Sequence, residues 1–151
     1  MSPRTLFRTL AIAEAITWTL LITALIVRAT TGFAFGVSIG GGIHGFVFLA
    51  YGATAVLVAI NQRWPVGVTV LAIGSAVIPY ATIPTERWLY RNGALEGDWR
   101  REATDDPRDA GSIDRLARWF IRRPLLLALL IAVAVAALFT VLLIAGPPGG
   151  R

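Results

Sequence analysis

Charged side chains divide this chain into long apolar runs. Residues 9–27 contain one charge, Glu14, while residues 29–62, 64–85 and 124–150 contain none. A helix of roughly 20 apolar residues crosses a hydrocarbon core of about 30 Å, and its backbone groups bond to one another inside the helix. The pattern therefore predicts four membrane-spanning helices, near residues 8–27, 38–60, 66–84 and 124–145.

We expect an all-α membrane protein, a small four-helix transmembrane bundle with a long charged loop before its last helix. Residues 1–90 would form a three-helix membrane core, followed by the charged loop at 91–123, the fourth span at 124–145 and a tail at 146–151. The alternative for the first apolar run is a signal peptide. Glu14 inside that run, and the lack of a small-x-small cleavage site after it, favour a retained helix.

The stretch at 86–123 has a different composition, with nine arginines and eight acidic residues. Its 96–112 part has the Gly, Pro and charge content of a flexible linker, and Ser112 is placed to cap a short helix. Residues 113–123 form either a basic amphipathic helix at the membrane surface or the start of a long fourth helix. The apolar face of such a helix would hold Ile113, Leu116 and Phe120.

Arginine positions bear on orientation, because the side of the membrane that carries more Lys and Arg is usually cytoplasmic. The nine arginines of 86–123 place this loop in the cytoplasm, at a bacterial plasma (inner) membrane. With four spans, both termini then lie outside. Arg4 and Arg8 favour the opposite orientation, so the two signals conflict.

Composition supports the membrane class and narrows the chemistry. The chain is 56% hydrophobic, 15% charged and has a mean hydropathy of +0.67, whereas soluble domains are about a quarter charged. Absence of cysteine and lysine excludes thiolate metal sites, cysteine nucleophiles and Schiff-base lysines. One histidine is too few for a zinc or bis-histidine haem site. We expect no metal, no cofactor and no enzyme activity. The acids in the basic loop argue against nucleic acid as a partner.

Three polar residues are candidates for function inside the bundle: Glu14, His44 and Tyr51. A carboxylate in a bilayer costs about 2.5–3.5 kcal/mol, so Glu14 should face a protein partner or a cavity. His44 and Tyr51 share a face of the second helix, where Tyr51 lies at the depth of Glu14 and could donate a hydrogen bond to it. Thr17 and Trp18 should point into the bundle as well. Glu14 is then either a proton- or cation-binding carboxylate or a structural acid.

Small and cyclic residues predict how the helices pack. Gly41 and Gly45 let two helices approach closely, and Pro79 should kink or break the third span. The segment 36–40 spells G-x-S-x-G, but the strand–turn–helix context of a nucleophile elbow is missing. Residues that suit the membrane interface as anchors are Arg8, Arg87 and Trp88.

Several short segments carry a resemblance to a known family. They are Arg8 with Ala13-Glu14-Ala15, the run from Gly42 to Tyr51, Arg63-Trp64-Pro65, and Val77-Ile78-Pro79-Tyr80. The chain resembles, over about residues 4–90, the bacterial membrane family called domain of unknown function 3817. Pro79-Tyr80-Ala81 departs from the Pro-Phe-Gly often found there. The resemblance implies a bacterial integral membrane protein and brings no established activity.

A second resemblance is shorter. Residues 13–20 are similar to the first helix of the small multidrug resistance transporters, four-helix proteins with a membrane-embedded glutamate.

The first hypothesis for function is a non-enzymatic helper or subunit of a plasma-membrane assembly. Its partners would be the lipid bilayer and either another membrane protein or further copies of the chain. The alternative is a small proton-coupled transporter of cationic or lipophilic small molecules that uses Glu14.

Overall fold

The computed structural model describes residues 1–145, and over this range it contains helices and no strands. The predicted all-α class is confirmed, while the predicted tail at 146–151 lies outside the described residues. The α-helices are α1 (Pro3–Thr31), α2 (Phe35–Gln62), α3 (Val66–Gly74), α4 (Thr82–Arg91), α5 (Ser112–Ile121) and α6 (Pro124–Ala145). Two short 3₁₀ helices are η1 (Ser75–Val77) and η2 (Pro107–Ala110).

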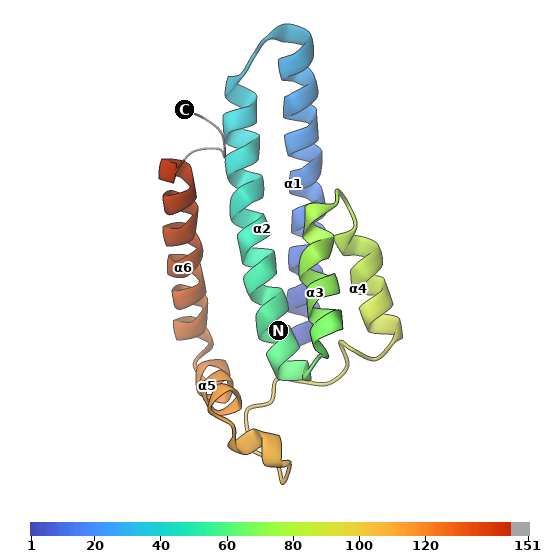
Figure 1. Ribbon diagram of the computed structural model, residues 1–151, viewed down its shortest axis with the longest axis vertical. Helices are drawn as coiled ribbons and strands as arrows, with labels where there is room; N and C mark the ends of the chain where they lie inside the picture. The colour runs from blue at the N-terminus through green and yellow to red at the C-terminus, as the bar shows by residue number, and fades with distance from the viewer. Residues whose placement is uncertain (146–151) are drawn as a thin grey trace.

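A long antiparallel pair, α1 and α2, runs from the top of the molecule down to the level of α5 (Figure 1). At the start of α1, the Ser2 hydroxyl accepts the Thr5 N–H at 3.2 Å, and Pro3 takes the position where no N–H is needed. Gly32 ends α1 in the left-handed region, with φ of 77°. By length and composition, α1, α2 and the described part of α6 are suited to cross a membrane.

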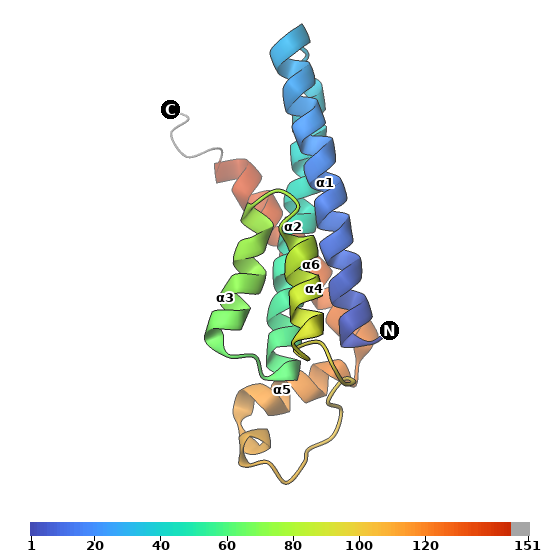
Figure 2. The same cartoon turned by 90° about the vertical axis from the view of Figure 1, so that its right-hand side faces the viewer.

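The predicted third span is not one helix but a short helical hairpin. The apolar segment Val66–Val77, which is α3 with η1, ends before Pro79, and α4 runs back beside it (Figure 2). Pro79 has no N–H to continue the helix, and Tyr80 adopts φ of 65°. The predicted break at Pro79 is confirmed, but a single helix over 66–84 is wrong and the count of four helices is not confirmed.

The hairpin also changes where the N-terminus lies. A segment that turns back returns the chain to the end of the molecule from which it came. The N-terminus and the loop after α4 therefore meet, and the Trp99 indole N–H donates to the Met1 carbonyl at 2.8 Å. The predicted placement of the N-terminus opposite the loop is wrong, because α3 and α4 together make no net crossing.

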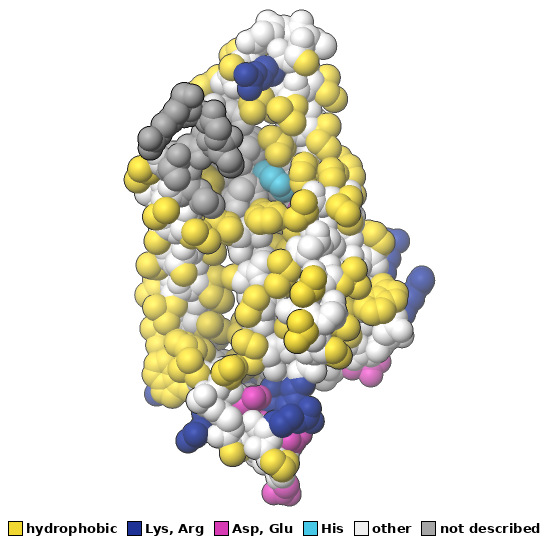
Figure 3. Space-filling view, viewed as in Figure 1, with side chains coloured by type: hydrophobic (Ala, Val, Ile, Leu, Met, Phe, Trp, Pro, Cys, Tyr) yellow, Lys and Arg dark blue, Asp and Glu magenta, His cyan; other side chains and the backbone are white. Residues whose placement is uncertain are grey.

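Arginines consequently gather at one end of the helices. Arg4, Arg8 and Arg63 join the nine arginines of 86–123 there, while Arg28 lies at the other end of α1. Figure 3 shows most charged side chains in the lower part of the molecule, below a surface that is largely hydrophobic. The conflict between the N-terminal arginines and the loop therefore disappears.

The amphipathic helix α5 forms as a separate element across the end of the bundle (Figure 2). A continuous fourth helix from 113 onward is wrong, because α5 ends at Ile121 and α6 begins at Pro124. Ser112 is the first residue of α5 and makes no capping hydrogen bond, so its predicted capping role is also wrong. Exposed apolar side chains on α5 are Ile113, Leu116 and Trp119.

The buried core lies near the arginine-rich end, between α1, α2 and the α3–α4 hairpin. Phe7 of α1 is fully buried, and its ring centroid lies 5.4 Å from that of Tyr51 and 5.7 Å from that of Trp64. Such tilted and edge-on aromatic pairs stabilise a core beyond the area they bury. The other members are Ala11, Ala55, Val58, Ala72, Ala76, Leu89 and Leu95.

Glycines of α2 allow two different neighbours to approach. A Cβ atom on Gly41 would lie 3.8 Å from Leu21 of α1, whereas one on Gly45 would lie 3.2 Å from the Phe139 ring of α6. Gly41 and Gly45 therefore face different helices rather than one shared partner. Contact at Gly45 is close enough that any side chain there would push Phe139 away.

The hairpin makes a topology prediction that a four-span bundle does not. Because the natural chain has no cysteine, single cysteines at Thr5, Thr31 and Ala103 can each be labelled alone with an impermeant maleimide in intact cells. All three side chains are exposed. We expect Thr5→Cys and Ala103→Cys to react alike and Thr31→Cys to react oppositely. Opposite reactivity of Thr5→Cys and Ala103→Cys would contradict the hairpin and support four membrane spans.

Candidate functional site: polar side chains within the helices

Glu14 is fully buried on α1, and its partner comes from the α3–α4 hairpin. One carboxyl oxygen, Oε2, lies 3.0 Å from the hydroxyl of Thr82, the first residue of α4. The same hydroxyl lies 3.0 Å from the Ala11 carbonyl on α1. The other carboxyl oxygen, Oε1, is buried without a hydrogen-bond partner in the described structure. Glu14 and Thr82 thus join α1 to α4 inside the apolar part of the molecule.

A hydroxyl has one proton to donate, yet the Thr82 oxygen faces two oxygen atoms. If Thr82 donates to the Ala11 carbonyl, the contact with Glu14 needs a proton from the carboxyl group. A neutral Glu14 therefore satisfies both contacts, and it also avoids burying a bare charge beside the unpartnered Oε1. The geometry fits a carboxylic acid that donates a hydrogen bond.

Thr17 connects Glu14 to His44. The Thr17 hydroxyl lies 2.9 Å from the Glu14 carbonyl and 3.1 Å from Nδ1 of His44 on α2. The indole ring of Trp18 lies 4.4 Å from the imidazole, between ring centroids. Glu14, Thr17 and His44 are buried, as the sequence predicts, and Trp18 is partly buried. No direct hydrogen bond joins Glu14 to His44 among these contacts.

Side chains of α1 and α2 also donate to backbone carbonyls of the hairpin. The Tyr51 hydroxyl donates to the Ala72 carbonyl at 2.9 Å and lies 3.2 Å from the Ser75 hydroxyl. The Trp18 indole N–H donates to the Ala76 carbonyl at 3.2 Å. In a continuous helix that carbonyl would accept from residue 80, a bond lost at the break. The predicted hydrogen bond from Tyr51 to Glu14 is wrong, because Tyr51 is engaged with α3.

Among the described residues, no group of three or more His, Asp or Glu side chains is positioned to hold a metal ion. Two apolar grooves in the described part of the chain, one of about 550 Å³ and one of about 340 Å³, are not lined by Glu14, His44 or Tyr51. Chemically, the arrangement holds the re-entrant hairpin against α1 and α2.

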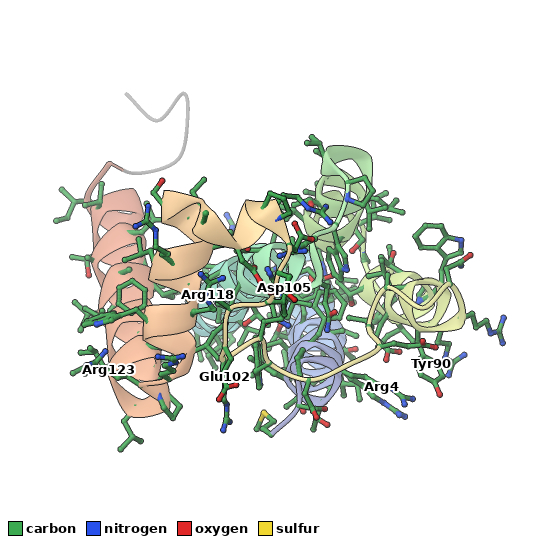
Figure 4. The ribbon with its side chains drawn as sticks, turned by 90° about the horizontal axis from the view of Figure 1, so that it is seen from below. Arg4, Tyr90, Glu102, Asp105, Arg118 and Arg123 are labelled. Carbon is green, nitrogen blue, oxygen red and sulfur yellow. The ribbon has the colours of Figure 1, made fainter. Side chains whose placement is uncertain are left out.

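A second polar cluster lies at the arginine-rich end and is centred on Asp109. Its Oδ1 lies 2.5 Å from Arg63, 2.9 Å from Arg100 and 3.0 Å from Arg118. Its Oδ2 accepts from the N–H and the hydroxyl of Thr104, both at 2.7 Å. These hydrogen bonds, first of all those from Thr104, lower the pKa of Asp109 to about 2. Figure 4 shows this end from below, with Arg118 directed toward the centre.

The cluster ties the charged loop to the end of α2. Arg63, which ends α2 in the left-handed region, also pairs with Asp106. Arg100 donates to the Asn61 carbonyl at 2.5 Å and to Asp114 of α5 at 2.8 Å. The predicted flexible linker over 96–112 is therefore wrong for this segment, whose side chains form a partly buried ion cluster around the buried Asp109.

The predicted interface anchors occupy exposed positions at this end. Arg8 and Arg87 are exposed, and the side chain of Trp88 on α4 is 44% exposed. Arg4 lies over the ring of Tyr90, at 3.4 Å from its centroid (Figure 4). Their positions fit the boundary between apolar helices and water, while their roles stay predictions.

Thr82 and Asp109 are the site residues that the sequence analysis missed. Thr82 lies in an apolar run of the sequence. A threonine in such a run is common and does not by itself predict a contact with another helix. The only sequence signal is its position, three residues after Pro79, which marks the start of a new helix. Asp109 is one of eight acids between arginines, and nothing in that pattern singles it out.

These features define an all-helical membrane protein whose α1–α2 pair carries a helical hairpin that turns back. Residues 4–91 match the family described as domain of unknown function (DUF3817), and the chain belongs to this family. The match ends at the last residue of α4, so it covers α1, α2 and the hairpin. The resemblance over about residues 4–90 is confirmed.

One similar protein comes from Streptomyces coelicolor and is named "Putative membrane protein SCO5905". It is 40% identical over 93 residues, which cover 59% of this chain and 11% of the relative. The chain thus matches a small part of a much longer protein. No solved structure matches the chain.

The Thr82 contacts predict a measurable loss of stability. Thr82→Val removes the donor to Ala11 and the partner of Glu14 with little change of shape. We expect it to lower the stability in detergent by about 1–3 kcal/mol, because buried polar atoms lose their partner. Thr82→Ser should stay near the parent. Thr140→Val is the matched control, since exposed Thr140 bonds only within α6. Equal effects of the two valine variants would contradict the pairing.

The Asp109 cluster predicts a pH dependence. A carboxylate whose pKa is lowered in the folded state stabilises that state above the ordinary value of about 3.9, and this contribution is lost as pH falls toward the folded value. With a folded pKa of about 2, the window for Asp109 is roughly pH 4 to 2. We expect Asp109→Asn to have a lower apparent Tm than the parent at pH 6 and a smaller further drop across this window. Asp105→Asn, at an exposed acid without an ion pair in the described structure, should keep the parent profile.

Proposed function

We propose that this protein is a non-enzymatic subunit or helper of a membrane assembly, in which the α1–α2 pair and its hairpin serve as a rigid recognition module. The observation that carries the proposal is the internal use of the polar side chains. Glu14, Thr17, Trp18, His44 and Tyr51 contact the module's own backbone and side chains. In such a module the buried polar groups form hydrogen bonds that hold its own fold. This arrangement suits binding to a partner protein better than catalytic or transport turnover.

The partner is another membrane protein in this proposal. In the Streptomyces coelicolor relative, the matching region is 11% of the chain and is therefore joined to a long remainder. Regions that are fused in one protein often act together when they occur apart. Beyond the tip of the hairpin, α1 and α2 continue with exposed apolar side chains such as Ile26 and Ile39 (Figure 2). This uncovered length of α1 and α2 is where we place the partner.

We further propose the bacterial plasma membrane, with the arginine-rich end in the cytoplasm. The support is the distribution of arginine, which the hairpin places almost entirely at one end. The same orientation puts α5 at the cytoplasmic surface. Its exposed Ile113, Leu116 and Trp119 then rest among lipid headgroups.

One observation favours the alternative, a small proton-coupled transporter. Oε1 of Glu14 is buried without a partner in the described structure, which is a position where a proton or a cation would gain a contact. In such a transporter Glu14 must be ionised in part of each cycle, and Gln cannot replace it. In the assembly, Gln serves as well as Glu, because its amide can donate to Thr82.

Two substitutions of Glu14 separate these functions. We expect Glu14→Gln to keep its membrane level and co-purifying partners, and Glu14→Ala to lose part of both. The alanine variant leaves the hairpin without its contact, at a cost of about 1–3 kcal/mol. The measurement is a pull-down from native cells in mild detergent with mass spectrometry, alongside pH-dependent flux of a lipophilic cation.

The matched controls are Glu96→Gln and Glu96→Ala, at an exposed acid outside the membrane helices. Both should behave as the parent. Recovery of the parent alone, without any defined partner, argues against the assembly. A folded Glu14→Gln variant that abolishes a pH-dependent cation flux of the parent would establish the transporter instead.

A further inference from the structure

An apolar groove runs between α6 and the α1–α2 pair, apart from the polar network. Its volume is about 550 Å³, within the range of small-molecule sites, and it is open along one side. Its walls are apolar over most of their length, with Leu10, Phe46 and Ala128 as representatives of the three helices. The groove exists because α6 packs on α2 and α5 but leaves α1 uncovered at this level.

The length of the groove corresponds to one leaflet of a bilayer. On α6 its lining extends from Pro124 to Val135, and on α2 from Phe46 to Leu57. At 1.5 Å per residue each wall is about 16 Å long, close to half of a hydrocarbon core of about 30 Å. Beyond the deep end, Phe139 closes on Gly45 of α2. The groove thus begins at the arginine-rich end and stops about half-way along α6.

The mouth of the groove is basic. Arg101 lines it beside Met1. Arg101 is exposed and forms no ion pair in the part of the chain that the structure describes. The Arg122 side chain approaches as well, since its Nε donates to the Arg101 carbonyl at 2.6 Å. Glu102 is the acidic neighbour in sequence and is not among the residues that line the groove. Figure 4 shows Glu102 at this end of the molecule.

We propose that the groove binds one acyl chain of an anionic phospholipid, with the phosphate at Arg101. An apolar slot one leaflet deep matches an acyl chain in length and chemistry. A cationic side chain at the surface end selects an anionic headgroup over a zwitterionic one. The second groove, between α2, α3 and α6, has no charged residue in its lining and so offers no such selection.

The experiment is native mass spectrometry of the full chain with added phosphatidylglycerol or phosphatidylcholine of equal chain length. We expect one phosphatidylglycerol bound in preference to phosphatidylcholine. Arg101→Gln should weaken phosphatidylglycerol roughly fivefold, the effect of about 1 kcal/mol per basic residue at a membrane surface, and leave phosphatidylcholine unchanged. Arg115→Gln is the control, with the same charge change at an exposed position on α5.

A second pair of variants tests the apolar groove itself. Ala128→Phe fills the groove and should remove the bound lipid, whereas Ala137→Phe, exposed elsewhere on α6, should retain it. Circular dichroism and a single elution peak verify folding, and Arg101→Gln, at an exposed side chain, tests the proposal if Ala128→Phe does not fold. The proposal is overturned by equal binding of both lipids, or by equal effects of Arg101→Gln and Arg115→Gln. A lipid-free dimer that Ala128→Phe dissociates also overturns it, with a second copy as the occupant.

Discussion

Backbone groups inside a bilayer must find partners within the protein, and the break between η1 and α4 is where this requirement is hardest to meet. A helix that ends in apolar surroundings leaves carbonyls without their usual N–H donors. Here the Tyr51 hydroxyl and the Trp18 indole donate to the carbonyls of Ala72 and Ala76. Thr82, at the start of the returning helix, is fixed by Ala11 and Glu14. The polar residues of α1 and α2 are therefore explained largely by the hairpin that they hold.

The arginine-rich end follows from the same hairpin. Because α4 returns to the level where α3 began, the loop after it lies directly below α1 and α2. Asp109 then meets Arg63 from the end of α2, Arg100 from the loop and Arg118 from α5. Three guanidinium groups around one carboxylate tie the loop and α5 to the end of α2. The loop acts as a folded cap on this end of the helices, and α6 follows it and packs on α2 and α5.

Sequence reasoning reached the class, the long helices and the burial of Glu14, because each depends on a property of the local chain. Hydropathy over roughly 20 residues identifies a span, and the cost of a buried charge directs Glu14 inward. The sequence pattern did not predict the hairpin, because residues 64–85 are long and apolar enough for a single membrane span. Pro79 predicts a helix break. The direction of the helix that follows, onward or back, depends on contacts from α1 and α2. Likewise, the loop at 96–112 has a linker's composition, and only its partners at Asn61 and Arg63 give it a fixed shape.

The match to the family stops at Arg91, where the chain has returned to the end of the molecule at which α1 begins. α1 leads away from the arginine-rich end, α2 returns to it, and the hairpin departs and comes back. A segment that starts and finishes on the same side can be joined to the front of another membrane protein without inverting anything that follows. In this chain the following part is a cap and one further helix. In a longer protein it can be any number of helices, and each keeps the orientation it had alone.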